Sequence, residues 1–141
     1  MAWVVDTCVL LDIALSDAVF ALLSAKAIDS ARSDGLIACP ITLVELSPEF
    51  GGNLAEISNF LSGLGVYAER IWRDADTDAA ARAWAAYVGA RRAGNTRKRP
   101  VADILIGAVA SRHGGIITRN PNHFQPWFSK LKVLNPTELH S

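Results

Sequence analysis

Four short apolar runs constrain the fold of this chain more than any other feature. They are AWVV at residues 2–5, LIAC at 36–39, GIIT at 115–118 and KVLN at 132–135. Runs of this length that are rich in β-branched residues, with glycine or proline close by, are typical of buried parallel strands. Helical patterns fill the stretches between them, so strand and helix signals alternate along the chain.

The helical stretches carry their own end signals. We predict helices over residues 16–33, 53–61, 74–94 and 99–115. The third is alanine-rich, acidic at its start and basic at its end, which suits the helix dipole, and it closes at Gly94. The fourth begins near Pro100 and closes at a glycine. With no internal repeat or long linker, the pattern predicts one domain over residues 1–141, an α/β/α sandwich with a mostly parallel sheet.

Composition narrows the class of protein. The 141 residues are 50% hydrophobic and 20% charged, which is typical of a globular domain. The formal net charge of zero argues neither for nor against a nucleic-acid partner. Cys8 and Cys39 lie in apolar runs and are expected to be core residues rather than a disulfide or metal ligands. No signal peptide and no apolar stretch of ~20 residues is visible, so we expect a cytoplasmic protein without membrane contact.

Asp6 interrupts the apolar run VVDTCVLL at residues 4–11. Burying a carboxylate without a partner is costly, so its presence requires a reason. The residue falls at the carboxyl end of the first predicted strand, where parallel α/β sheets bind their ligands. Aspartate is also a preferred helix N-cap. For Asp6 alone, a cap and a functional site are both open interpretations.

Two further acids occupy informative positions. Glu45 follows the second predicted strand, and the spacing Thr42-x-x-Glu45 is a capping box that alone would explain the glutamate. Asp103 is the only charged residue between Val101 and Ser111. Because that helix is apolar on all sides, it is expected to be buried. The carboxylate of Asp103 must then be neutral, paired or metal-bound, with modest help from the helix dipole.

A fourth polar stretch, ITRNPNHF, follows the third predicted strand. Thr118 ends the strand and Asn120 comes two residues later. An Asx turn ahead of a helix would explain this stretch if it stood alone. Its position at a strand end nevertheless places both side chains near the other polar residues of the same sheet edge.

Taken together, these residues predict a metal site. Four of them, Asp6, Glu45, Thr118 and Asn120, lie just beyond strand ends, and Asp103 opens a helix. Three converging carboxylates repel one another, and Mg²⁺ or Mn²⁺, which takes oxygen ligands and keeps several waters, is the common solution. Such a site can bind and polarise a phosphodiester and supply a metal-bound hydroxide as nucleophile.

The four motifs, in this order, resemble the PIN domain family. They are VVDT near the start, TLVEL after the second strand, ADILIGAVA in the late helix and TRNPNHF after the third strand. The length and spacing are more narrowly similar to VapC-type toxins of toxin–antitoxin pairs. The resemblance implies a Mg²⁺- or Mn²⁺-dependent endoribonuclease, often a homodimer, that a cognate small antitoxin protein holds inactive.

The resemblance also implies site residues. The family's three acids fall on Asp6, Glu45 and Asp103, with Thr7 after the first acid and Thr118 as a supporting residue. Many members carry a fourth acid either directly after the TR dipeptide or three residues on. Those positions hold Asn120 and His123 here. Asparagine can bind a metal through its carbonyl oxygen but brings no charge, so one or two metals, and strong or weak activity, remain open.

The run ARRAGNTRKRP leads into the helix that carries the third acid. Arg91 and Arg92 are better explained as ordinary charges at a helix C-terminus. Arg97, Lys98 and Arg99 are better placed to steer an RNA backbone toward the acids. No aromatic residue interleaves this run, so base stacking is not indicated, and the tryptophans are expected in the core or at an interface.

Other classes with acids at strand ends fit less well. A HAD-type phosphatase needs a second aspartate two residues after the first, where this chain has Cys8. A response-regulator receiver needs an early pair of adjacent acids, which is absent from the sequence. The alternative from a different class is a catalytically weak or silent PIN fold that binds RNA or protein, which would show binding without hydrolysis.

Overall fold

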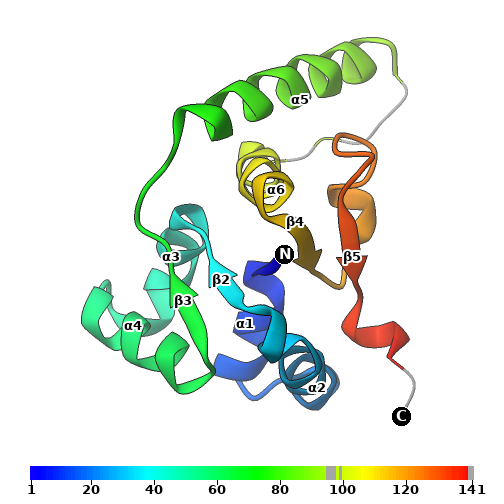
Figure 1. Ribbon diagram of the computed structural model, residues 1–141. Helices are drawn as coiled ribbons and strands as arrows, with labels where there is room; N and C mark the ends of the chain where they lie inside the picture. The colour runs from blue at the N-terminus through cyan, green and yellow to red at the C-terminus, as the bar shows by residue number, and fades with distance from the viewer. Residues whose placement is uncertain (95–97, 99, 140–141) are drawn as a thin grey trace.

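The computed structural model describes residues 1–94, 98 and 100–139. Its strands are all parallel and form one sheet in the order β3-β2-β1-β4-β5. The strands are β1 (Ala2–Val5), β2 (Leu36–Ala38), β3 (Val66–Ala68), β4 (Gly114–Ile117) and β5 (Lys132–Leu134). The α-helices are α1 (Thr7–Ala14), α2 (Ala21–Ala31), α3 (Pro40–Leu46), α4 (Leu54–Gly63), α5 (Asp74–Arg92) and α6 (Val101–His113) (Figure 1).

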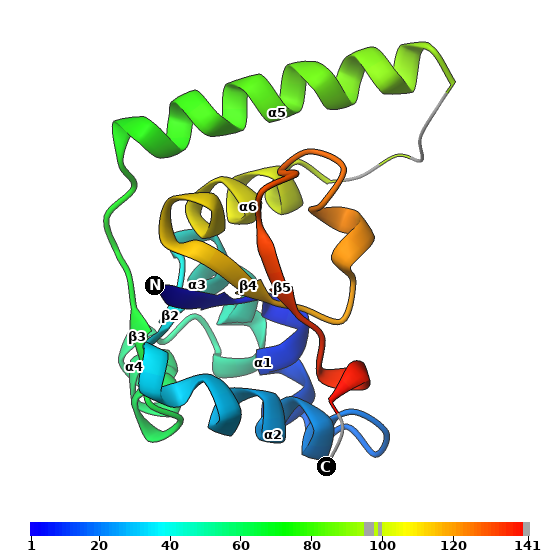
Figure 2. The same ribbon diagram turned by 45° about the vertical axis from the view of Figure 1, so that its right-hand side comes forward.

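Successive side chains of the central strands face two separate cores, as the two-residue period of a strand requires. Val4 and Ile116 pack in the core that α5 and α6 cover. Val5 and Ile117 pack in the core that α1, α2, α3 and α4 cover. Figure 2 shows α6 and α5 above the sheet and α1 and α2 below it. The predicted α/β/α sandwich is confirmed, with a sheet that is wholly parallel.

Most predicted elements end within one or two residues of the observed bounds, and two differences are larger. The short edge strand β3 was not predicted. The predicted helix over residues 16–33 is wrong in its first part, because Ser16 has a φ of 50° and the chain turns there between α1 and α2. Asp17 stabilises that turn, since its Oδ1 accepts hydrogen bonds from the backbone N–H groups of Val19 (2.9 Å) and Phe20 (2.8 Å).

The capping box expected at Thr42 and Glu45 does not form. The helix α3 begins at Pro40, with Cys39 as its N-cap, so Thr42 lies inside the helix and is fully buried. Proline at the first helical position has its φ already set for a helix and has no N–H to leave unpaired. The position of Glu45 therefore needs another explanation than helix capping.

A cluster of ion pairs joins the end of α6 to the start of α5. Arg112 donates from Nε to Oδ1 of Asp76 (2.7 Å) and from Nη2 to Oδ2 (3.0 Å), and it also pairs with Glu69. His113 Nε2 lies 3.0 Å from Glu69 Oε2. Burial alone would raise the pKa of Asp76, but the Arg112 guanidinium keeps that pKa below its usual value. In the part of the chain that the structure describes, no helix has the length and apolar character needed to cross a membrane.

Candidate functional site: an acidic pocket at the sheet edge

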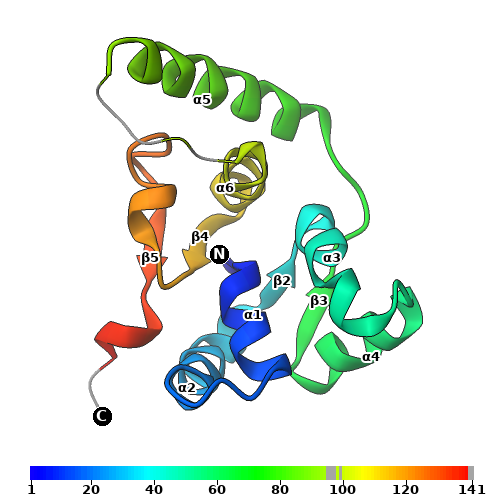
Figure 3. The same cartoon turned by 180° about the vertical axis from the view of Figure 1, so that it is seen from behind.

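A pocket of about 300 Å³ lies at the carboxyl edge of the sheet, where β1 and β4 end. Figure 3 shows α1 leaving this edge between α3 on one side and β4 on the other. The lining residues are Asp6, Thr7, Cys8, Leu11, Glu45, Pro100, Asp103, Asn120 and His123. The structure thus brings the three predicted acids to one pocket, together with Asn120 and His123.

Asp6 serves as a helix cap and also lines this pocket. Its Oδ1 accepts a hydrogen bond from the backbone N–H of Thr7 (2.8 Å), which caps α1. Its Oδ2 accepts from the hydroxyl of Thr118 (2.7 Å) and from the thiol of Cys8 (3.3 Å). The backbone N–H of Asp6 donates to the carbonyl of Ile117 (2.9 Å), which ties the end of β1 to the end of β4. The two interpretations left open by the sequence are therefore compatible.

The environment of Asp6 disfavours its charged form. Only 6% of the residue is exposed. Its hydrogen-bond donors are neutral groups, and among the described residues it forms no ion pair with Lys, Arg or His. Burial raises the pKa of Asp6, the nearby charge of Asp103 raises it further, and the hydrogen bonds offset only part of this rise. A bound cation would relieve the electrostatic cost of this arrangement.

Thr7 explains the position of Glu45. The Thr7 hydroxyl donates to Oε1 of Glu45 (2.7 Å) and lies 3.0 Å from the hydroxyl of Thr42. This contact joins the first turn of α1 to α3. Glu45 itself is exposed at the pocket rim, while Thr7 and Thr42 are buried beneath it. The side chain of Glu45 is thus held toward the pocket by a long-range contact.

Asp103 lies in the first turn of α6 and is half-buried. The expectation of a helix buried on all sides is wrong at this end, because Val101 is 47% exposed. Oδ2 of Asp103 lies 3.4 Å from Nδ1 of His123, which is in a short 3₁₀ turn (Pro121–His123). The imidazole of His123 therefore faces the third acid in the pocket wall.

The segment after β4 connects Asp6 with Asn120. The Thr118 hydroxyl donates to Asp6 and accepts from the backbone N–H of Asn120 (3.0 Å). Nδ2 of Asn120 lies 3.8 Å from Sγ of Cys8, which itself donates to Asp6. The side chain of Asn120 makes no cap hydrogen bond, so the Asx turn considered from the sequence is not what shapes this segment. Instead, these contacts form a closed ring around one oxygen of Asp6.

The sequence prediction placed both cysteines in the core; Cys8 is half-buried and packs against the core that α1 to α4 cover, but it also has a second place that was not predicted. Cys39 is buried in the core, whereas Cys8 forms part of the pocket wall. Burial, followed by the charge of Asp6, raises the pKa of Cys8 to about 12. The thiol therefore stays protonated at neutral pH and acts as a hydrogen-bond donor. The position of Cys8, directly after Asp6 and Thr7, was the feature of the sequence that could have indicated its place in the pocket wall.

The donor atoms of the pocket fit a hard divalent cation. Carboxylate and amide oxygens are the groups that Mg²⁺ and Mn²⁺ prefer. In residues 1–94, 98 and 100–139, no group of three or more His, Cys, Asp or Glu side chains is arranged to hold a metal by itself. Mg²⁺ is usually held by one or two carboxylates and keeps several waters, so the residues present fit a hydrated ion rather than a closed site.

The predicted RNA-contacting run is only partly described. Arg97 and Arg99 lie outside the described residues, and Lys98 is exposed. Arg91 and Arg92 lie in the last turn of α5, as expected for charges at a helix C-terminus. The role of residues 97–99 therefore stays a prediction.

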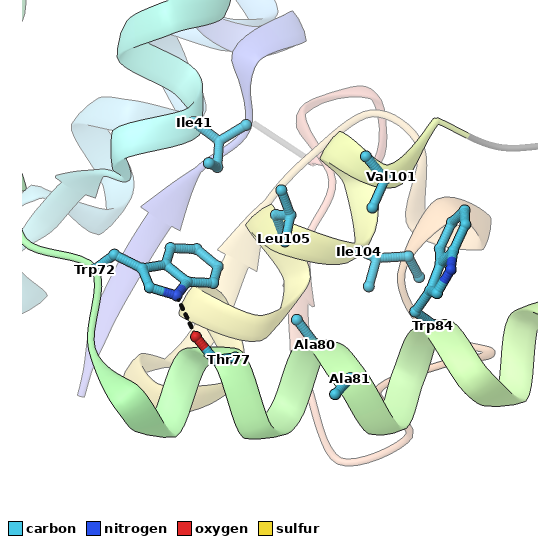
Figure 4. Close-up of a pocket in the computed structure, with 9 residues that line it drawn as sticks. All are labelled: Ile41, Trp72, Thr77, Ala80, Ala81, Trp84, Val101, Ile104 and Leu105. Atoms are coloured by element: carbon cyan, nitrogen blue, oxygen red, sulfur yellow. Dashed lines mark hydrogen bonds between the residues drawn. The ribbon is translucent and has the colours of Figure 1, made fainter.

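A second pocket, of about 370 Å³, is apolar and lies between α5, α6 and the start of α3 (Figure 4). Its lining residues are Ile41, Trp72, Thr77, Ala80, Ala81, Trp84, Val101, Ile104 and Leu105. Trp72 donates from Nε1 to the Thr77 hydroxyl (2.6 Å). Among the residues that the structure describes, no acid or base lines this pocket, so the candidate chemistry belongs to the acidic pocket.

The fold and site together define an α/β/α protein with an acidic pocket at the carboxyl edge of a parallel sheet. The PIN domain family model matches residues 3–126. The chain therefore belongs to the PIN domain family, whose members are generally nucleases, and the resemblance seen in the four sequence motifs is confirmed.

Comparison with solved structures supports the fold independently. A chain in the structure of FitAB bound to an IR36 DNA fragment is similar, with a TM-score of 0.64 and 18% sequence identity. The match covers 98% of this chain and 97% of that chain. At this identity the likeness shows a shared fold. No curated protein matches the chain.

Proposed function

We propose that this protein is a Mg²⁺- or Mn²⁺-dependent endoribonuclease of the VapC type, acting as the toxin of a toxin–antitoxin pair. The observation that carries the proposal is the presence of Asp6, Glu45, Asp103 and Asn120 in one pocket at the carboxyl edge of the sheet. Membership of the PIN family supports a nuclease, and the burial of Asp6, which hydrogen bonds offset only in part, supports a cation in the pocket.

Each side chain has a distinct part in this proposal. Asp6, Asp103 and Glu45 hold the metal, and Asn120 contributes a carbonyl oxygen without charge. When bound, the metal supplies positive charge that polarises the phosphodiester and lowers the pKa of a bound water. The hydroxyls of Thr7 and Thr118 act by orienting carboxylates: Thr7 donates to Glu45, and Thr118 donates to Asp6.

The proposed substrate is single-stranded or loop RNA. Pro100 lines the acidic pocket, and in the sequence it directly follows the three basic residues. Arg97, Lys98 and Arg99 bind backbone phosphates in this scheme, which adds affinity without base specificity.

The proposed partners are a second copy of the chain and a small antitoxin protein. The toxin role predicts a short neighbouring reading frame upstream, whose product has an N-terminal DNA-binding motif. Its product should co-purify with the PIN protein and inhibit cleavage. A product that neither binds nor inhibits would contradict the toxin role without contradicting the nuclease activity.

The experiment that tests the nuclease is cleavage of single-stranded RNA with and without EDTA. The wild type should cleave in Mg²⁺ or Mn²⁺ and stop cleaving in EDTA, and Asp6→Asn should lose activity by orders of magnitude. Asp29→Asn is the matched control, because Asp29 is an exposed acid on α2 that pairs with Arg32, just beyond the end of that helix. Equal cleavage by the wild type and Asp6→Asn would refute the catalytic role of the pocket.

A silent PIN-fold binding module is the second candidate. The observation that favours it is the occupation of the acids by protein groups: both oxygens of Asp6 accept hydrogen bonds, and Asp103 faces His123. Asn120 also removes a charge that many relatives have. RNA binding without metal-dependent cleavage, unchanged in Asp6→Asn, would support this candidate.

A further inference from the structure

Another buried acid, Asp12, lies on α1 outside the acidic pocket. Only 5% of the residue is exposed. Its carboxylate accepts two hydrogen bonds from Arg119, from Nε to Oδ2 (2.8 Å) and from Nη2 to Oδ1 (3.0 Å). The hydroxyl of Ser24 on α2 adds a third, to Oδ2 (2.8 Å). A bidentate arginine–carboxylate pair fixes orientation as well as distance.

The guanidinium of Arg119 stacks on the ring of Phe20 in addition to its hydrogen bonds with Asp12. Its central carbon lies 3.9 Å from the centre of the Phe20 ring, at the start of α2. The hydrogen bonds that Arg119 donates to Asp12 raise the pKa of Arg119. Arginine suits such a position because its planar fork loses little freedom when it binds. Two helices therefore hold one side chain of the segment that follows β4.

Arg119 stands between the two residues that contact the acidic pocket. Thr118, on one side, donates to Asp6, and Asn120, on the other, lies against Cys8. Fixing residue 119 restricts the backbone on both sides of it. A buried ion pair is weak evidence for added stability. The Asp12–Arg119 pair therefore matters for its effect on the positions of Thr118 and Asn120.

We propose that Arg119 is a positioning residue for the acidic pocket, and that its bidentate pair with Asp12 holds the segment from Thr118 to Asn120 in place. The effect on the metal and on cleavage rests on the proposed function. The effect on the segment itself does not. Groups that orient metal ligands typically change metal affinity by roughly 10- to 100-fold when they are removed.

The test compares Arg119→Gln with Arg112→Gln. Arg112 is the matched control, because it makes the same fork on the buried Asp76, but neither of its neighbours in the sequence lines the pocket. Two quantities are measured at a temperature where circular dichroism shows every variant folded. They are the hydrogen-exchange rate of the Asn120 backbone amide by NMR and the affinity for Mn²⁺ by calorimetry.

Arg119→Gln should speed exchange at Asn120 and weaken Mn²⁺ binding by roughly 10- to 100-fold. Arg112→Gln should leave both quantities at their wild-type values. Wild-type exchange and Mn²⁺ affinity in Arg119→Gln would overturn the proposal. If Arg119→Gln does not fold, Arg119→Lys, which keeps the charge but lacks the planar fork, decides by the same measurements. If the wild type binds no Mn²⁺, the proposed function fails, and the exchange of Asn120 still tests the positioning role.

Discussion

Replacing Asp6 by asparagine should separate its structural role from its role in metal binding. Asparagine is about as good an N-cap as aspartate, and its Oδ1 can still accept the Thr7 N–H. Its Nδ2 would replace Oδ2, which now accepts from Thr118 and Cys8. Because Nδ2 donates, the Thr118 hydroxyl must turn and accept, and the Cys8 thiol loses its acceptor at this atom. The metal-free variant should therefore keep the fold with a rearranged hydrogen bond.

These contacts set the expected change in unfolding free energy when Asp6→Asn is made in the metal-free protein. A hydrogen bond to a charged group is worth about 1.5–3 kcal/mol, against about 0.5–1.5 kcal/mol for a neutral pair. Replacing the charge-assisted hydrogen bond at Oδ2 by a neutral one therefore costs roughly 1–1.5 kcal/mol. Removing a charge whose burial raises its pKa offsets that cost. We expect the two metal-free proteins to differ in unfolding free energy by about 1 kcal/mol or less, which is about 3 °C in Tm for a chain of this size.

The pH dependence of this difference has a definite sign. Because the folded-state pKa of Asp6 is raised above its model value of 3.8, the folded protein binds this proton more tightly than the unfolded chain. Wild-type stability from this group is therefore greatest at low pH and is lost as the pH rises from about 3.8 through the folded pKa. Asp6→Asn has no carboxyl group to ionise at this position. Its unfolding free energy relative to the wild type should therefore increase as the pH rises through this range.

Mn²⁺ should raise the Tm of the wild type but not that of Asp6→Asn. At 100 times its Kd, a ligand that binds only the folded state adds about 2.7 kcal/mol of stability. With an unfolding entropy of roughly 0.3 kcal/mol/K for this length, the wild-type Tm should rise by about 9 °C in Mn²⁺. Asp6→Asn should show almost no rise. The assay is thermal melting by circular dichroism, with Mn²⁺ and with EDTA. An equal Mn²⁺-dependent rise in both proteins would refute Asp6 as a metal ligand.

Two further predictions concern packing and RNA. A Cβ at Gly107 would lie 2.3 Å from Cε2 of the buried Phe128 ring, so Gly107→Ala should cost about 1–3 kcal/mol in a denaturant melt. Gly89→Ala on α5 meets no atom within 4 Å and should gain up to about 1 kcal/mol; equal effects would contradict this reasoning. Neutralising the basic residues at 97–99 should flatten the salt dependence of RNA binding by roughly one unit per lost phosphate contact, whereas neutralising 91–92 should not.

The sequence predicted the central part of the fold because its signal is local. The strands β1, β2 and β4 are apolar on both faces, as strands covered by helices must be. The edge strand β3 was missed because its middle residue, Tyr67, is 67% exposed, so the segment lacks the fully apolar character of a buried strand. The break between α1 and α2 was missed because it depends on the φ of Ser16 and on one capping side chain, Asp17.

The candidate site was predictable where a buried charge demanded an explanation. Asp6 and Asp103 interrupt apolar segments, and an interruption of that kind is visible in one sequence. Contacts between distant segments are not visible in this way. The pair of Asp12 and Arg119 joins residues 107 positions apart, and no periodicity or spacing connects them. The contact between Thr7 and Glu45 likewise depends on how α1 and α3 come together.

The central claim is that Asp6, Glu45, Asp103 and Asn120 form one centre for a divalent cation. Anomalous scattering from crystals soaked in Mn²⁺ tests it most directly, because the signal locates the ion without reference to activity. We expect an anomalous peak in the acidic pocket, within coordinating distance of the carboxylates of Asp6 and Asp103 and surrounded by water. A pocket without a peak at saturating Mn²⁺, or a peak bound only by other residues, would contradict the account.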